Sequence, residues 1–179
     1  NFCFELIHYD VWGSYRVSSS SSAKYFLTIV DDYSRCVWIY LMKQKSEATD
    51  YLIMFCNMAK TQHKLVVKQI RSDNGREFFS DSILAFIKQN GILCQKSCVD
   101  TPQQNGVVER KHRHLLGVAR ALRIQAGLLK RFWGERVLTA GYLINLTPTP
   151  ILSSKSPYEI CFINLPIMIT YKCLVVYVL

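Results

Sequence analysis

The order of strand-like and helix-like segments is the feature that most limits how this chain can fold. Three extended, apolar segments come first, at residues 4–12, 25–33 and 36–42. They are rich in the β-branched and aromatic residues that favour strands. A serine-rich, hairpin-type loop at 17–23 separates the first two segments, and residues 32–35 form the turn before the third. These segments predict the beginning of a β-sheet.

After residue 45 the pattern alternates between helical and strand-like periods. Ala48, Leu52, Phe55 and Ala59 recur at helical spacing, which predicts a helix over 46–61 with Ser46 as its N-cap. The later predicted elements are a strand at 66–72, a helix at 80–89, a strand at 92–97, and helices at 107–126 and 130–146. This order predicts an α/β fold, a five-stranded mixed sheet flanked by helices.

Composition is consistent with a single globular domain that has a basic surface. The chain has 179 residues, of which 50% are hydrophobic and 12% aromatic, so it can bury a substantial core and is not a disordered sequence. Lys and Arg number 22 against 13 for Asp and Glu, which gives a net charge of +9. Such an excess favours binding to DNA or RNA, but charge alone does not decide between a nucleic-acid-binding protein and an ordinary basic protein.

The cysteines and the two terminal segments indicate in which cellular compartment the protein resides. The seven cysteines include no CxxC pair, and we expect them to be reduced and mostly buried, as in an intracellular protein. The first residues do not follow the order of a signal peptide. The apolar segment 163–179 is interrupted by Pro166 and Lys172. The sequence therefore predicts neither secretion nor insertion into a membrane.

Three acidic residues lie in distinctive local sequences. Asp10 lies in the first strand within ELIHYDVWG, Asp73 follows the fourth strand within RSDNGREF, and Glu109 lies in the first turns of the long helix. If the first and fourth strands are neighbours, both aspartates emerge at one edge of the sheet, where the start of the helix can deliver Glu109. Two Mg²⁺ or Mn²⁺ ions held by such carboxylates can bind the attacking oxygen and the leaving oxygen of a phosphodiester exchange. The pattern predicts a site that cuts and joins nucleic acid.

The strings around these acids resemble one known family. The chain closely resembles the integrase catalytic core of copia-type retrotransposons in IHYDVWG, FLTIVDDYSRCVWIYLMKQKSEA, IRSDNGREF and TPQQNGVVERKHRHLL, and the resemblance continues in FWGERVLTAGYLINLTPT and KSPYEI. The thirty-five residues between Asp73 and Glu109 also match. The resemblance covers residues 4–166 and implies a ribonuclease-H-like integrase catalytic core. We interpret residues 167–179 as a degenerate or truncated C-terminal extension.

The resemblance implies metal-dependent polynucleotidyl transfer for DNA integration. Asp10, Asp73 and Glu109 would be the catalytic triad that holds two Mg²⁺ or Mn²⁺ ions. Water would attack near the 3′ end of element DNA, and the freed 3′ hydroxyl would then attack the target DNA. The implied partners are element ends, target DNA and further copies of the chain. The implied location is intracellular, in the nucleus during integration, with a cytoplasmic virus-like particle as the alternative.

Polar side chains near Glu109 are candidates for DNA contacts. They are Gln103, Gln104, Asn105, Arg110, Lys111, His112, Arg113 and Arg120. His112 and Arg113 lie three and four positions after Glu109, so a helix places them on its face, where phosphate contacts would add salt-sensitive affinity. The alternative interpretation is a solvated helix face on which Arg113 pairs with Glu109, and ordinary loop chemistry for residues 103–105.

Three further polar residues are expected to have structural roles. Asp31 and Asp32 end the second strand, and we expect them to form its turn. His8 shares a strand face with Asp10. We interpret it as a satisfied structural histidine rather than a residue that tunes the acidic site.

Two other functions remain open from the sequence. The chain could be a non-catalytic nucleic-acid-binding or assembly remnant of a transposable element, given its +9 charge. The zinc-binding and DNA-binding domains that flank such cores in the family are also not apparent in these residues. A cellular ribonuclease H would keep the fold and the metal chemistry but act on RNA–DNA hybrids. The string QQNGVVERKHR argues against the ribonuclease H.

Overall fold

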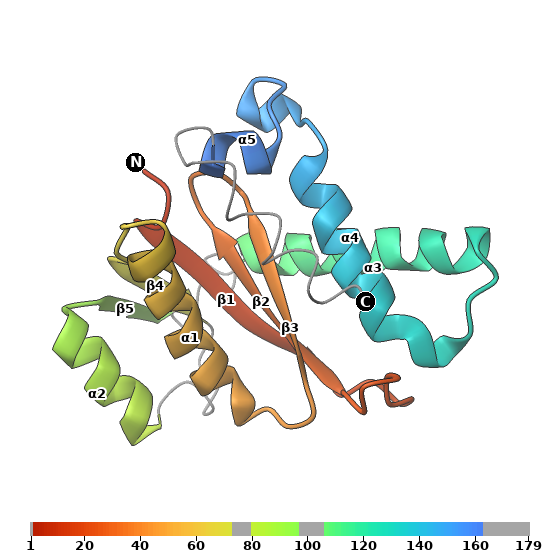
Figure 1. Cartoon of the computed structure of the whole chain (residues 1–179), viewed down its shortest axis with the longest axis horizontal. Helices are drawn as coiled ribbons and strands as arrows, with labels where there is room; N and C mark the ends of the chain where they lie inside the picture. Colours follow the sequence, from red (N-terminus) through yellow and green to blue (C-terminus); the bar gives the residue numbers. More distant parts are fainter. Residues whose placement is uncertain (1, 73–79, 97–105, 163–179) are drawn as a thin grey trace.

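Five strands lie side by side in one sheet at the centre of the protein (Figure 1). The computed structural model describes residues 2–72, 80–96 and 106–162. The strands are β1 (Leu6–Gly13), β2 (Tyr25–Asp31), β3 (Val37–Met42), β4 (Gln69–Ser72) and β5 (Leu93–Lys96). The helices are α1 (Glu47–Gln62), α2 (Asp81–Asn90), α3 (Gly106–Gln125), α4 (Trp133–Leu146) and α5 (Pro157–Phe162), with short 3-10 helices at Lys130–Phe132 and Pro150–Leu152. Every strand and helix predicted from the sequence is present.

The sheet is mixed, as predicted, and its strand order is β3-β2-β1-β4-β5. The β1–β2 and β2–β3 pairs are antiparallel, whereas the β1–β4 and β4–β5 pairs are parallel. The register places Asp10 opposite Thr28 of β2 and His8 beside Arg71 of β4. The first and fourth strands are therefore neighbours, which is the condition on which the predicted acidic site depends.

The two faces of the sheet carry separate cores. Leu27 and Ile29 of β2 belong to the core that the sheet forms with α1 and α5, and Phe26 and Val30 belong to the core that it forms with α3 and α4. Alternate residues of a strand point to opposite faces, so β2 is buried on both sides. Helix α3 packs against β1 and β2, and α4 packs against β3. In Figure 1, α1 lies in front of the sheet and α3 passes behind it.

Helix ends largely follow the sequence signals, with one difference. Gly91 has a left-handed backbone (φ 62°) and ends α2, as glycine at a helix C-terminus commonly does. Ser46 occupies the N-cap position of α1, but its side chain accepts no hydrogen bond from the helix. The carboxylate of Glu47 instead accepts the backbone N–H groups of Lys43 and Gln44, at 3.0 and 2.7 Å.

Helix α5 is present although the sequence analysis assigned no helix there. Ser156 and Glu159 form a reciprocal capping box at its start. The Ser156 N–H donates to Glu159 Oε2 at 2.6 Å, and the Glu159 N–H donates to Ser156 Oγ at 3.2 Å. A serine followed three residues later by glutamate is a known helix-start pattern, so SPYE was the overlooked signal.

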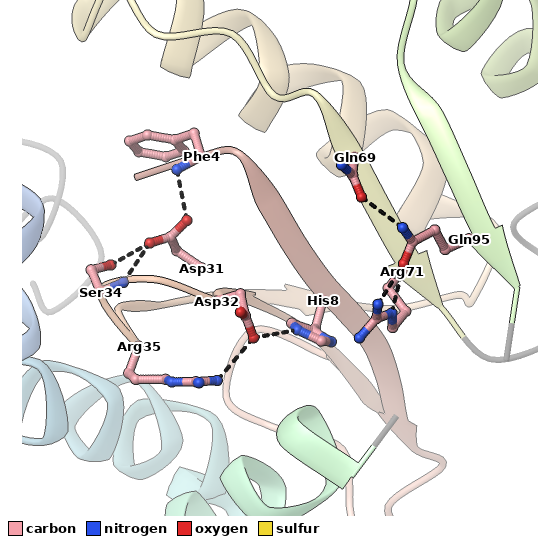
Figure 2. A network of polar contacts seen from close by, with 9 residues as sticks. All are labelled: Phe4, His8, Asp31, Asp32, Ser34, Arg35, Gln69, Arg71 and Gln95. Atoms are coloured by element: carbon pink, nitrogen blue, oxygen red, sulfur yellow. Dashed lines mark hydrogen bonds and ion pairs between the residues drawn. The ribbon is translucent and has the colours of Figure 1, made fainter. Parts of the chain in front are cut away.

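Asp31 ties the N-terminal segment to the turn after β2 (Figure 2). Its side chain is fully buried and accepts the Phe4 N–H at 2.7 Å, the Ser34 N–H at 2.8 Å and the Ser34 hydroxyl at 2.6 Å. Desolvation raises the pKa of this carboxyl, and the donated hydrogen bonds oppose that shift. The structure thus confirms the turn-forming role expected for Asp31.

Asn145 of α4 satisfies the backbone of the edge strand β3. Its Oδ1 accepts the Val37 N–H at 2.9 Å, and its Nδ2 donates to the Val37 carbonyl at 2.8 Å. The side chain is almost completely buried. The side-chain amide makes the two hydrogen bonds that a neighbouring strand would make with Val37. The contact therefore fixes α4 against the sheet edge and prevents another strand from pairing at Val37.

Among the described helices, none combines the length and the apolar character needed to cross a bilayer. The cysteines in the described part of the chain are all free. Cys36, Cys56 and Cys161 are buried, Cys3 is partly buried and Cys94 is exposed.

Replacing Asp31 with alanine tests the turn network. Asp31→Ala leaves the donors of Phe4 and Ser34 without an acceptor in the core, so we expect the free energy of unfolding to fall by about 2–4 kcal/mol. Urea denaturation followed by circular dichroism measures the change. The control is Asp50→Ala on exposed α1 surface, for which we expect a loss below about 1 kcal/mol. Equal losses in the two variants would contradict the assignment.

The ring of His63 predicts a pH dependence of stability. It stacks on Phe4, with ring centroids 5.8 Å apart, and contacts Phe162, and burial lowers its pKa below 6.5. At a pH between the lowered pKa of His63 in the folded protein and its ordinary pKa of about 6.5 in the unfolded chain, the unfolded chain binds more protons than the folded one. Stability should therefore fall as the pH drops through about 6.5. As the pH is lowered through this range, we expect His63→Phe to lose less free energy of unfolding than the wild type, as measured by urea titrations. Identical losses in the two proteins would contradict the role of His63.

Candidate functional site

Asp10 lies in the middle of β1 on the sheet face that α3 covers. Its side chain is 17% exposed, so the carboxylate is largely enclosed but still reaches the surface. Oδ1 accepts the backbone N–H of Val11 at 2.8 Å. The neighbouring position on β2 is Thr28, whose hydroxyl is buried and has no hydrogen-bond partner among the described residues. The strand thus fixes one oxygen of Asp10 and turns the other toward α3.

Helix α3 brings His112 against this carboxylate. His112 Nδ1 lies 3.5 Å from Asp10 Oδ2, and the ring packs edge-on against Phe26 with centroids 5.5 Å apart. Burial lowers the pKa of His112 to about 4, so the imidazole is neutral at neutral pH. Its Nε2 is buried without a hydrogen-bond partner in the described part of the chain. The contact joins two segments that are far apart in the sequence.

Glu109 is exposed and precedes His112 by three residues. Residues three apart on a helix are neighbours on its surface, so Glu109 lies about one helical turn from the contact between His112 and Asp10. The third predicted acid, Asp73, directly follows the last residue of β4 and lies outside the described residues. Within the described ranges, no group of three His, Cys, Asp or Glu side chains could hold a metal ion. The triad as a whole stays a prediction.

The predicted DNA contacts on α3 divide into exposed and enclosed side chains. Arg110, Arg113 and Arg120 are exposed, as expected for a polar helix surface. Lys111 and His112 point into the molecule instead. Lys111 Nζ donates to the carbonyl of Arg35 at 3.2 Å, and burial lowers the pKa of this amine.

Helical periodicity could not indicate these intramolecular partners, because it does not show that a polar residue has a polar partner inside the protein. Lys111 is partly buried and His112 is buried, and the DNA contacts of both stay predictions. The ion pairs between described residues do not include one between Glu109 and Arg113, the alternative raised from the sequence. Gln103, Gln104 and Asn105 lie outside the described residues.

A row of polar side chains crosses the same sheet face next to Asp10 (Figure 2). His8 is fully buried, and its Nε2 lies 2.8 Å from Asp32 Oδ1, which also pairs with Arg35 Nη1 at 3.0 Å. Desolvation lowers the pKa of His8, whereas Asp32 opposes that shift. On β4 and β5, Arg71 donates to Gln95 from Nε at 3.0 Å and from Nη2. His8 therefore has a partner for Nε2, as expected of a structural histidine, whereas its buried Nδ1 has no hydrogen-bond partner among the described residues.

Arg71 and Gln95 were missed from the sequence. The available signal was strand alternation, because Arg71 precedes Asp73 by two residues in IRSDNG, and a strand continued by one residue would carry both on one face. The β1–β4 register then places Arg71 on the sheet face of His8 and Asp10.

Comparison with known proteins places the chain in a family. Residues 4–102 match the integrase core domain family. The chain is 36% identical over 156 residues to the retrovirus-related Pol polyprotein from transposon TNT 1-94 of Nicotiana tabacum, which covers 87% of this chain and 12% of that protein. It is 35% identical over 158 residues to the corresponding polyprotein from transposon RE1 of Arabidopsis thaliana, covering 88% of the chain and 11% of that protein. The chain thus belongs to the integrase core domain family and spans about a tenth of these polyproteins.

Solved structures support the same fold at low sequence identity. The HTLV-2 integrase catalytic core domain in complex with magnesium superposes with a TM-score of 0.68 at 18% identity, covering 90% of this chain and 98% of that one. A chain of the simian T-cell lymphotropic virus intasome in complex with PP2A regulatory subunit B56 gamma gives a TM-score of 0.71 at 18% identity, covering 93% and 56%. The fold is ribonuclease-H-like, as predicted.

Substituting Lys111 and Arg113 tests the two orientations on α3. Lys111→Ala removes the hydrogen bond to the carbonyl of Arg35 and the packing of the aliphatic stem, so we expect the free energy of unfolding to fall by about 1–2 kcal/mol. Arg113→Ala removes an exposed side chain and should change it by less than about 0.5 kcal/mol. Thermal and urea denaturation of both variants make the comparison. Equal effects would show that Lys111 is not enclosed as described.

Proposed function

We propose that this chain is the catalytic core of an enzyme that integrates retrotransposon DNA. Asp10, Asp73 and Glu109 would carry the reaction by holding two Mg²⁺ or Mn²⁺ ions. The observation that carries the proposal is the contact of His112 with Asp10, because it brings the start of α3 to the acidic strand β1. The parallel neighbour of β1 is β4, and Asp73 follows β4 directly in the sequence.

The residues at this site fit divalent cations. Carboxylate oxygens are the ligands that Mg²⁺ and Mn²⁺ prefer, and Asp10 is partly open to solvent. The neighbouring His112 is neutral because burial lowers its pKa to about 4, so it does not compete with a cation for the negative charge of the carboxylate. A magnesium complex of a structurally similar integrase core supports the same choice of metal.

The proposed reaction has two steps that share this site. Water attacks a phosphodiester near the 3′ end of the element DNA, and the freed 3′ hydroxyl then attacks a phosphodiester of the target DNA. When bound, the two ions lower the pKa of the attacking oxygen and stabilise the leaving one. Asp10 is fixed for this task through the Val11 N–H and the His112 ring. The exposed Arg110, Arg113 and Arg120 supply positive charge for the DNA backbone.

The proposed partners are the element ends, the target DNA and other copies of this chain. Dimeric and trimeric forms of the HTLV-2 core and the simian virus intasome support an oligomer and a DNA partner. We propose an intracellular location, with integration in the nucleus and a cytoplasmic virus-like particle as the alternative site.

Substitution of the described acids tests the activity. Asp10→Asn and Glu109→Gln remove negative charge from the metal site, so we expect Mg²⁺- or Mn²⁺-dependent cleavage and joining of labelled element-end DNA to slow by at least about a hundredfold. The control, Asp50→Asn, changes an exposed acid on α1 and should retain full activity. Circular dichroism checks that each variant is folded.

Two results would count against the proposal. The first is a wild-type protein without metal-dependent activity on element-end DNA or on a preformed branched intermediate. If that protein still bound DNA with a salt dependence unchanged in Asp10→Asn, the non-catalytic binding module would be the better description. The second is efficient cleavage of RNA in an RNA–DNA hybrid, which would favour a ribonuclease H.

A further inference from the structure

The two arginines in the polar row beside Asp10 have partners of different charge. Arg35 pairs with the carboxylate of Asp32 at 3.0 Å, so its positive charge is compensated within the protein. The described hydrogen bonds of Arg71 go to the amide oxygen of Gln95, which is neutral, while its charge acts at longer range on Asp32 and helps to lower the pKa of that carboxyl. An amide orients the planar guanidinium without cancelling its charge, and a guanidinium binds phosphate well.

Gln95 is itself held in place, so Arg71 is oriented before any ligand arrives. Gln95 Nε2 donates to Gln69 Oε1 at 2.6 Å, which links β5 to β4 on the same sheet face. Figure 2 shows the chain of contacts from Gln69 through Gln95 to Arg71, next to His8 on β1. A side chain fixed in this way loses little further conformational freedom on binding.

The position of Arg71 relative to Asp10 follows from the strand register. Arg71 lies beside His8 across the parallel β1–β4 pair, and Asp10 is the next residue of β1 on that face. Two residues of a strand span about 6.6 Å. Helices α3 and α4 pack over β1, β2 and β3 on this face, and Arg71 is only partly buried. The guanidinium is therefore a near neighbour of the acidic site on the side toward β4.

We propose that Arg71, oriented by Gln95, binds a backbone phosphate of the DNA. This phosphate would be next along the strand to the phosphodiester that lies at Asp10. This inference rests on the proposed function, because it names a further contact of the same substrate. The guanidinium would donate two parallel hydrogen bonds to the phosphate and hold the strand against the β4 side of the site. A purely structural role, in which Arg71 only links β4 to β5, is the alternative that the experiment separates.

Charge-changing variants test the proposal through DNA binding. The probe is a short fluorescein-labelled DNA duplex, titrated by fluorescence anisotropy at several salt concentrations without divalent metal. For Arg71→Gln we expect about a tenfold loss of affinity at low salt and a decrease of about one in the slope of log affinity against log salt. The control, Lys60→Gln, removes the same charge from exposed α1 on the opposite sheet face and should leave the slope unchanged.

A second variant separates charge from structure. Gln95→Glu keeps an acceptor for Arg71 but supplies a carboxylate, so the arginine stays in place with its charge compensated. The variant loses the Gln95 donor to Gln69, and the Gln69 amide can turn to donate its N–H to the new carboxylate. We expect the same loss of affinity and slope as in Arg71→Gln, with a melting temperature close to that of the wild type. If Gln95→Glu binds DNA as the wild type does, Arg71 has only a structural role and the inference is wrong, even if Arg71→Gln does not fold.

The outcome also distinguishes this inference from the proposed function. A wild type that does not bind the duplex at all would count against the proposed function. A wild type that binds DNA and joins ends, with Arg71→Gln indistinguishable from Lys60→Gln, would overturn only the role of Arg71.

Discussion

The parallel pairing of β1 with β4 is the contact on which the rest of this structure depends. Parallel neighbours cannot be joined by a tight turn, so the chain must cross over between them. After the antiparallel strands β2 and β3, helix α1 provides that crossover and covers one face of the sheet. The opposite face is left for α3 and α4. With β1 in the centre, the strand of Asp10 lies between β2, which buries apolar residues on both faces, and β4, which carries Gln69 and Arg71.

The two faces of the sheet bury different polar groups. The α1 face is filled mostly by apolar residues of the strands and helices, and its fully buried Asp31 has all its described donors close by, in Phe4 and Ser34. The α3 face combines an apolar core under α4 with the buried His8, Thr28 and His112 around Asp10. Buried polar groups cost free energy unless they find partners. Asp32 and Asp10 each contact one ring nitrogen of a histidine, and the His112 contact helps fix how α3 sits on the sheet. The other ring nitrogens and the Thr28 hydroxyl are buried without a hydrogen-bond partner among the described residues.

Most elements could be predicted because periodicity and end signals are local. The order of strands and helices along the chain, the end of α2 at Gly91 and the long helix α3 all agree with the sequence patterns. Helix α5 was overlooked although SPYE carried a capping-box signal. The inward contacts of Lys111 and His112 were not foreseen, for a different reason. Their burial depends on the carbonyl of Arg35 and on Asp10, which are distant in sequence, and no local pattern contains that information.

By itself the sequence determined the kinds of elements, their order and the family, because hydrophobic period, turn residues and motif strings are properties of short segments. It also named the acids on which the proposed chemistry depends. Only the tertiary structure decided which side chains surround them. Strand register placed Arg71 beside His8, and helix packing placed His112 against Asp10. Such neighbours are set by contacts between distant segments, whose formation depends on the whole sheet and both of its cores.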